Sequence, residues 1–396
     1  MLHVTANGQC LEAQPHLGTE IAEVHADTNV TLEQVLADIR VRREEFDAKR
    51  HVPRDMIAQL KHVGVYRAAT PRCFGGSGMA PANFLKLIER ISAADASAGW
   101  VASFGSAAVY LAALPRETLA ELYADGPDVA FAGGLFPIQP ATRVEGGYRV
   151  NGLWKFASGC KGADILGVGI GAAEGGKPRT AVLRPCDVEV VENWEVIGLR
   201  GTGSHDLRVS DKFVPEAWTF VRGGAPTIEE PLYRYPSIAY AAQVLAVVNL
   251  GVARAALDDV SEMAGGRTGI TGAPRMADRA YLRIAVAKAE AELRSAQAFF
   301  YDATDAAWRS ILQGDNVSPD QTSMLRLSAV QAARAGANAV QAAYMLAGTA
   351  AIYDGHPLQR YLRDAMVVTQ HAFLGEGHYD GAGAVFLGVP PMPGYV

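Results

Sequence analysis

Apolar residues recur at intervals of three and four over most of the first 128 residues, which is the spacing of one helix face. A helix is predicted from Thr31, a residue suited to an N-cap, and a second helix begins near Pro53 and ends at Gly64. Further helices are expected over 81–95, 97–112 and 116–124, whereas residues 1–30 show no clear period. Residues 1–128 are therefore predicted to form an N-terminal helical domain.

The spacing of apolar residues changes near Asp128. From there to residue 232 the chain consists of short apolar runs separated by Gly and Pro, a pattern typical of β-strands. The run 145–147, Glu-Gly-Gly, has the composition of a hairpin turn between two of these strands. Residues 129–232 are therefore predicted to form a middle β-barrel or sandwich.

Helical periodicity returns at Tyr235 and persists almost to the C-terminus. Four long segments, 236–264, 276–313, 319–347 and 357–372, are rich in Ala and Leu and separated by short breaks. Such segments favour an antiparallel four-helix bundle over residues 233–396. The fold class is accordingly α+β. Because strands and helices do not alternate, a doubly wound nucleotide fold is disfavoured.

Composition excludes several classes of protein. A chain of 396 residues with 49% hydrophobic residues can bury a large core, and its net charge of −6 disfavours a nucleic-acid partner. The four cysteines have no metal-like spacing and are expected to be free thiols in a reducing cytoplasm. The N-terminus has no secretory signal pattern. The longest apolar stretch, 238–257, contains Gln243, Asn249 and Arg254 and is predicted to be a core helix, not a membrane span.

Familiar catalytic motifs are missing. The sequence contains no GxGxxG, HExxH or GxSxG, and "GAAEGGKP" departs from a phosphate-binding loop at Pro178. "HAFLGEGHYD" gathers His371, Glu376, His378 and Asp380, but the spacing matches no helical ligand pair, so no metal site is expected.

One predicted strand has an unusual composition for a core strand. In "GLWKFASGC" (152–160), alternation places Trp154, Phe156 and Ser158 on one face. Two flat aromatic rings and a hydroxyl suit a flavin, whose ring needs an apolar surface and a polar neighbour at N5. The same pattern also fits the core of a sandwich, with Ser158 at its edge.

Several stretches in this order resemble the acyl-CoA dehydrogenase superfamily over residues 35–390. The resemblance is carried by the predicted strand 152–160 and by four further stretches. These are "VPRDMIAQLKHVGVYRAATPRCFGGSGM", "IGLRGTGSHDLRVSDKFVPE", "LGVARAALD" and "LQRYLRDA". The dehydrogenases of this superfamily place a catalytic Glu after the R-D-A helix, where this chain has His371 and Ala372. That difference, together with the "GxWxFxSGC" form of the strand, resembles the flavin-dependent monooxygenase branch.

The resemblance implies the oxygenase component of a two-component monooxygenase. Such an enzyme takes reduced FAD (FADH2), or FMNH2, from a separate NAD(P)H-dependent flavin reductase. With O2 the flavin forms a C4a-hydroperoxide, which hydroxylates or epoxidises a small aromatic substrate. Members of this branch that hydroxylate phenols often carry a further His on the helix that corresponds to 99–111. This chain has no His there, which disfavours a phenol and favours an indole. The alternatives are an acyl-CoA dehydrogenase with Glu376 as a displaced base and a flavin-free binding scaffold.

The resemblance also implies roles for individual residues. Ser158 would stabilise the flavin N5 side and His371 would act on the substrate as a general base or hydrogen-bond donor, unless it merely caps a helix. The cofactor contacts implied are Trp154, Phe156, Ser158, Gly133, Arg200, Thr202, Arg267 and Thr268. The substrate contacts implied are Trp100, Phe104, Tyr110 and His371. Arg363 and Asp364 are expected to form an ion pair, and the small residues of 328–348 predict a homotetramer assembled through the bundle.

Overall fold

The structure is a computed structural model that describes residues 30–171, 177–265 and 275–395. Short helices form the N-terminal part, as the apolar spacing predicts. In order they are α1 (Leu32–Val41), α2 (Arg43–Lys49), α3 (Arg54–His62), α4 (Pro81–Ala94), α5 (Ala96–Ala102), α6 (Ala108–Leu111) and α7 (Arg116–Leu122). Thr31 caps α1 by accepting from the Gln34 amide, so the predicted start of this helix is confirmed.

The middle of the chain is a sheet of eight strands in the order β6-β7-β3-β1-β4-β5-β8, with β2 paired to β3. Its strands are β1 (Phe131–Gln139), β2 (Ala141–Val144), β3 (Gly147–Ala157), β4 (Ile165–Ile170), β5 (Arg179–Leu183), β6 (Glu189–Val191), β7 (His205–Pro215) and β8 (Thr219–Val221). The pair β1–β4 is parallel and the other pairs are antiparallel. The hairpin predicted at 145–147 joins β2 and β3.

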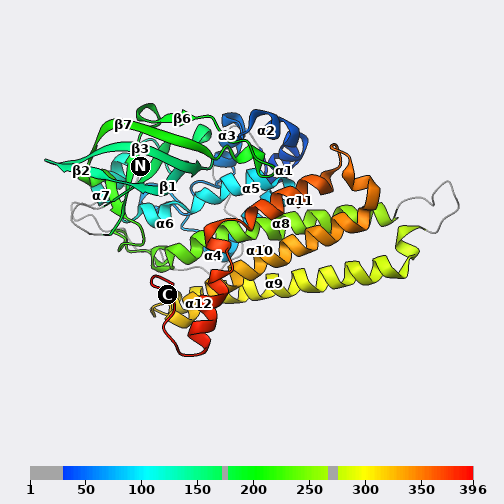
Figure 1. Ribbon diagram of the computed structural model, residues 1–396. Helices are drawn as coiled ribbons and strands as arrows, with labels where there is room; N and C mark the ends of the chain where they lie inside the picture. The colour runs from blue at the N-terminus through cyan, green and yellow to red at the C-terminus, as the bar shows by residue number, and fades with distance from the viewer. Residues whose placement is uncertain (1–29, 172–176, 266–274, 396) are drawn as a thin grey trace.

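Long helices form the C-terminal part: α8 (Ser237–Gly265), α9 (Ala280–Leu312), α10 (Pro319–Ala347) and α11 (Pro357–Val368). They match the four predicted segments and lie side by side, extending away from the sheet (Figure 1). A further helix, α12 (Gly377–Phe386), begins within the stretch 371–380 that gathers His371, Glu376, His378 and Asp380. α8 is long and apolar enough to cross a membrane, but 78% of its most apolar window is buried within the protein.

The N-terminal helices and the bundle share one hydrophobic core. Ile88 of α4, Val247 of α8 and Val340 of α10 belong to the same buried cluster. Helices approach closely here: a Cβ at Gly251 would lie 2.2 Å from the carbonyl oxygen of Glu89, and one at Gly336 would lie 2.6 Å from that of Asn249. A second cluster lies within the sheet, and a third joins α7 to the strands β4, β5 and β8. The predicted α+β architecture is confirmed.

Candidate active site

A chain of hydrogen-bonded side chains lies where β3 meets helix α5. The indole N–H of Trp100 donates to Ser158 Oγ at 3.1 Å. Ser158 Oγ lies 2.6 Å from Ser204 Oγ, which lies 2.7 Å from Thr202 Oγ1. Thr202 Oγ1 in turn donates to the carbonyl oxygen of Leu199 at 2.8 Å. Ser158 is buried, and it is held from both the helical and the β part of the molecule.

The direction of this chain follows from the number of protons. A hydroxyl has one proton to donate and two lone pairs to accept with. Because Thr202 gives its proton to a carbonyl, Ser204 must donate to Thr202, and Ser158 must donate to Ser204. Trp100 fills one lone pair of Ser158. What remains free on the Ser158 oxygen is one acceptor position.

Strand β3 does not alternate regularly through this stretch. Phe156 has a φ of 64°, and the pairing of β3 with β7 shifts register between Trp154 and Ala157. This bulge turns Phe156 outward, where its side chain is 65% exposed and meets Trp194 edge-on at a ring distance of 6.3 Å. The expectation that Trp154, Phe156 and Ser158 share one face is therefore wrong.

Trp154 and Gly133 belong to the interior of the sheet. Trp154 is fully buried, and its indole N–H donates to the Gly169 carbonyl oxygen at 2.7 Å. A Cβ at Gly133 would lie 3.1 Å from the ring of Phe131. Both residues were expected to contact the cofactor. The surroundings of Trp154 are already filled by protein atoms, whereas Gly133 is partly exposed and lies beside the Phe131 ring. Trp154 therefore occupies a core position, which is the second interpretation that the sequence allowed. Phe156 is the aromatic ring that this strand exposes.

His371 follows helix α11 and caps the next turn. Its Nδ1 accepts from the Phe373 amide at 3.2 Å, and its ring meets Trp100 edge-on at 5.7 Å. Because Nδ1 is used as an acceptor, the proton of the neutral ring resides on Nε2. Burial, with a smaller contribution from the nearby Arg222 charge, lowers the pKa of His371 to about 4. The imidazole is therefore neutral at pH 7 and presents an N–H donor.

A cationic residue beside His371 was missed by the sequence reasoning. The guanidinium of Arg222 lies 5.4 Å from the ring centre of Phe373 and 5.4 Å from that of Tyr110. Phe373 also meets the His371 ring edge-on at 5.1 Å. Arg222 follows the last strand without any motif, so no signal in the sequence distinguishes it. The structure thereby joins the predicted residues Ser158, Trp100, His371 and Tyr110 into one continuous cluster.

The turn 199–204 places Arg200 and Thr202 next to this cluster. Leu199 and Gly203 both adopt left-handed backbone conformations, with φ of 52° and 55°. The Leu199 amide donates to Asp364 Oδ1 of α11 at 2.6 Å, so the carboxylate serves this turn and not the ion pair expected with Arg363. The Nε atom of Arg200 is buried without a partner in the described structure.

The remaining predicted residues are scattered. Phe104 packs, partly buried, against the shared helical core. The Glu376 side chain is 80% exposed and forms an ion pair with Arg334 at 3.5 Å, so it is unsuited to act as a buried base. Arg267 and Thr268 lie outside the described residues. Among the described residues, no group of three or more His, Cys, Asp or Glu side chains is arranged to hold a metal ion.

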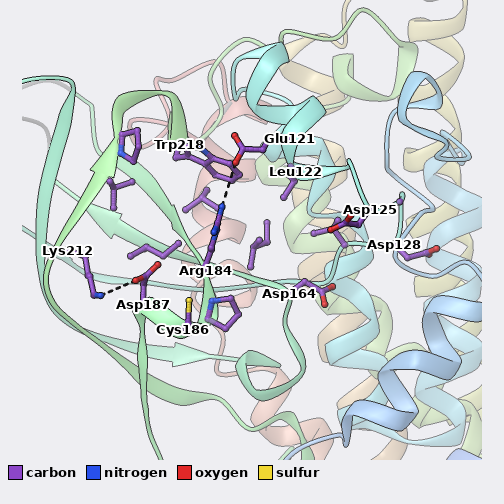
Figure 2. A pocket seen from close by; sticks show the side chains of 18 of the residues that line it. Glu121, Leu122, Asp125, Asp128, Asp164, Arg184, Cys186, Asp187, Lys212 and Trp218 are labelled. Carbon is purple, nitrogen blue, oxygen red and sulfur yellow. Dashed lines mark hydrogen bonds and ion pairs between the residues drawn. The ribbon is translucent and has the colours of Figure 1, made fainter. Parts of the chain in front are cut away.

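A large cavity of about 1290 Å³ lies elsewhere, between α7 and the sheet (Figure 2). Its charged side chains pair with one another: Arg184 with Glu121 at 3.7 Å, and Lys212 with Asp187 at 3.0 Å. None of the predicted site residues lines this cavity. It is separate from the cluster around Ser158 and His371.

A reduced flavin fits the chemistry of the cluster. The free acceptor position on Ser158 suits an N–H donor such as N5–H of the reduced ring. The exposed ring of Phe156 offers flat apolar surface, and the unpartnered Nε of Arg200 offers a donor for a polar flavin atom. Ser158 and Arg200 thus each keep a hydrogen-bonding position that the described residues do not fill.

The fold combines a helical domain, a mixed sheet and a helical bundle, and Ser158 lies where these parts meet. This arrangement defines an acyl-CoA dehydrogenase-like flavin fold. The sequence matches the acyl-CoA dehydrogenase N-terminal domain over residues 30–122 and the C-terminal domain over residues 243–376. The crystal structure of 3-HSA hydroxylase from Rhodococcus sp. RHA1 superposes with a TM-score of 0.87 at 25% identity, covering 92% of this chain and 98% of that one.

Curated relatives refine this class. Indole-3-acetate monooxygenase of Pseudomonas putida is 55% identical over 360 residues, covering 90% of this chain and 92% of the relative. The oxygenase component of FADH2-dependent resorcinol hydroxylase from Rhizobium sp. (strain MTP-10005) is 31% identical, covering 91% and 94%. The chain belongs to the flavin-dependent monooxygenase branch of the acyl-CoA dehydrogenase family. It is an oxygenase component that uses reduced flavin, and the dehydrogenase alternative with Glu376 is not favoured.

Proposed function

We propose that this oxygenase transfers one oxygen atom to an indole that carries an acetate side chain, indole-3-acetate being the expected substrate. The observation that carries the proposal is the position of Trp100, which donates to Ser158 and meets the ring of His371. This one residue links the group suited to a reduced flavin with the group suited to a substrate. The 55% identity to a relative named for indole-3-acetate supports the substrate.

Reduced flavin, when bound, activates O2 and supplies the oxygen atom that is transferred. The residues that would hold its ring are Ser158, as an acceptor, with Phe156 and Arg200. Since Ser158 donates to Ser204, its remaining lone pair is oriented by the protein before the cofactor arrives. We propose FAD as the flavin, because a relative is named for FADH2, and a separate NAD(P)H-dependent reductase as its source.

His371 would act on the substrate as a hydrogen-bond donor. Its low pKa keeps the ring neutral, and its Nδ1 lone pair is occupied by the Phe373 amide. A general base needs a free lone pair, whereas a donor needs only the Nε2 proton that this tautomer carries. Of the two roles expected for His371, the geometry therefore favours donation.

The aromatic surroundings would keep water from the reacting groups. Trp100 and Phe373 both meet the ring of His371, and Tyr110 packs against Phe131 at a ring distance of 5.6 Å. Exclusion of water protects an activated oxygen species from unproductive decay to H2O2. A dry, aromatic site also suits a flat apolar substrate ring.

The test is an assay of the purified chain with chemically reduced FAD, isotopically labelled O2 and indole-3-acetate. We expect a product that contains one labelled oxygen atom, and less of it when FMN replaces FAD. Free reduced flavin without the protein provides the background. Release of H2O2 only, with no labelled product from indole-3-acetate or indole, would refute the proposed substrate class.

Two further parts of the proposal concern the protein's setting. We propose that the chain forms a homotetramer and acts in the cytoplasm. Large apolar side chains at the end of the bundle, such as those of Met345 and Tyr353, are 70% and 71% exposed, which supports association through the helices. The scattered cysteines support a reducing compartment.

A further inference from the structure

Arg222 lies in the connection between strand β8 and helix α8. Its guanidinium carbon is 5.4 Å from the ring centre of Tyr110 and 5.4 Å from that of Phe373. Tyr110 belongs to the N-terminal helices, and Phe373 follows the last helix of the bundle. The cation is therefore flanked by aromatic rings from two other parts of the chain, and Arg222 is only partly exposed.

The positive charge of Arg222 has no counter-ion within the described part of the chain. No ion pair or hydrogen bond to its guanidinium is found there, and the aromatic rings of Tyr110 and Phe373 are its close neighbours. Burial lowers the pKa of Arg222, although an arginine stays charged at neutral pH. A partly buried charge without a counter-ion costs free energy, which a ligand of the opposite charge would offset.

Two other arginines with little exposed surface have protein partners. Arg326 also lies over an aromatic ring, that of Tyr395 at 5.2 Å, but it donates to the Gly394 carbonyl oxygen at 3.0 Å. Arg360 pairs with Asp47 at 2.7 Å. Arg222 differs from these two residues, because no protein partner for its guanidinium is found among the described residues.

The position of Arg222 places it on the substrate side of the site. Phe373 contacts both Arg222 and His371, and the charge of Arg222 is close enough to lower the pKa of His371. Because His371 is neutral, it does not compete with Arg222 for an anion. His371, a hydrogen-bond donor, and Arg222, a cation, thus both lie beside the ring of Phe373.

We propose that Arg222 binds the carboxylate of the substrate's side chain and so makes the enzyme selective for aromatic acids. This inference rests on the proposed function and deepens it. The planar guanidinium presents parallel N–H donors that match the two oxygens of a carboxylate. The flanking rings of Tyr110 and Phe373 hold that plane and leave its edge for the ligand.

The test compares indole-3-acetate with its neutral isostere indole-3-acetamide. In wild type we expect kcat/KM to favour the acid, and in Arg222→Met this preference should fall by about 10²-fold, mostly through KM. Arg222→Lys keeps the charge but not the planar pair of donors, so it should recover part of the preference. An unchanged acid-to-amide ratio in Arg222→Met would overturn the proposal.

Binding measurements separate this inference from the proposed function. Calorimetric titration of indole-3-acetate into flavin-loaded protein needs no turnover, and Arg222→Met should weaken the affinity by a similar factor. Arg326→Met, which removes another arginine that lies over an aromatic ring, should leave the affinity unchanged. Weaker binding of reduced flavin with unaltered binding of indole-3-acetate would overturn the proposal, because it would assign Arg222 to an anionic group of the cofactor.

Discussion

Asp364 Oδ1 accepts the backbone N–H of Leu199 at 2.6 Å, and this contact ties helix α11 to the turn that carries Arg200 and Thr202. Asp364 is buried, and desolvation together with the negative charge of Asp95 raises its pKa to about 7. The carboxyl is therefore only partly ionised near neutral pH, at a position that connects the bundle to the flavin side of the site.

The first prediction concerns the pH dependence that Asp364 confers. The folded pKa of about 7 lies above the usual 3.8 of an aspartate, so the folded state binds more protons than the unfolded chain between these values. The stability that results is complete below pH 4 and is lost as pH rises to about 7, by roughly 2–4 kcal/mol. Asp364→Asn keeps an acceptor for Leu199 and should flatten this dependence. Urea unfolding at pH 5 and pH 8 measures it, and equal slopes in variant and wild type would contradict the assignment.

The second prediction is that Ser158 controls how efficiently oxygen reaches the substrate. Ser158→Ala removes the acceptor, so product per flavin oxidised should fall and H2O2 release should rise. One hydrogen bond in a buried site is worth about 1 to 3 kcal/mol, and the change in coupling should be of that size. Ser328→Ala, a buried serine of α10 that bonds only to Leu325, is the matched control. Coupling identical to wild type in Ser158→Ala would remove the residue from the site.

The third prediction tests the link through Trp100. Trp100→Phe retains an aromatic ring but loses the N–H that donates to Ser158. We expect coupling to fall by a factor of a few, less than in Ser158→Ala, because the hydroxyl chain to Ser204 remains. Product yield and H2O2 should be measured together. A Trp100→Phe variant that is more impaired than Ser158→Ala would show that the indole acts by another route, such as substrate packing.

The fourth prediction separates the catalytic role of His371 from its role as a cap. His371→Ala should consume reduced flavin and O2 at a near-normal rate but lose about 10²-fold in product. If the residue is only a cap, the variant should lose about 1 kcal/mol of stability and keep its coupling. His378→Ala, which removes a neighbouring imidazole bonded to the Ala372 carbonyl oxygen, is the control.

The pH profile of wild type gives an independent check on His371. Its folded pKa of about 4 lies below the usual 6.5, so the folded state binds fewer protons and stability is lost as pH falls from 6.5 through 4. Product yield should accordingly show no titration of this ring between pH 6 and 8. A yield that follows a group with pKa near 6.5, absent in His371→Ala, would show that the ring ionises during catalysis.

The fifth prediction is the homotetramer. Tyr281 and Ile284 at the start of α9, and Ile352 and Tyr353 after α10, are all more than half exposed. The start of α9 and the end of α10 lie at the same end of the bundle (Figure 1). Light scattering should give a mass near four times the 42.0 kDa of the chain. Ile284→Glu should reduce that mass, whereas Val41→Glu, at an exposed position on α1, should not. A monomeric wild type would contradict the prediction.

The sequence pattern predicts elements whose local signals agree with their tertiary surroundings. The capping threonine at residue 31 and the long Ala-rich segments of the bundle are examples, since their helical spacing and burial point the same way. The bulge at Phe156 was not predicted, because the alternation of side chains along the sequence does not show where the strand pairing shifts register. Helix α12 contains three glycines and aromatic residues without a clear period, so its helical state depends on packing against α10.

The residues of the candidate site also include some that the sequence indicates and one that it does not. Ser158 and His371 are found from the sequence because they stand in recognisable stretches, and the hydroxyl chain through Ser204 needs only the turn beside it. Arg222 stands in no motif, and its importance follows from what surrounds it in space: two rings from distant segments and no acidic partner. Unpaired charge is a property of the folded molecule, which spacing along the chain does not encode.

The shared core of the N-terminal helices and the bundle has a consequence for dissection of the protein. Helix α8 is enclosed by α4 on one side and by α10 and α11 on others, and Asn249 bonds across to the carbonyl oxygens of Ala333 and Ala365. A fragment that began at residue 233 would expose the α4-facing surface of α8 to water, and such an exposed apolar surface promotes aggregation. Expression as separate pieces is thus unpromising, whereas insertions at surface turns far from α8 should leave the enzyme whole.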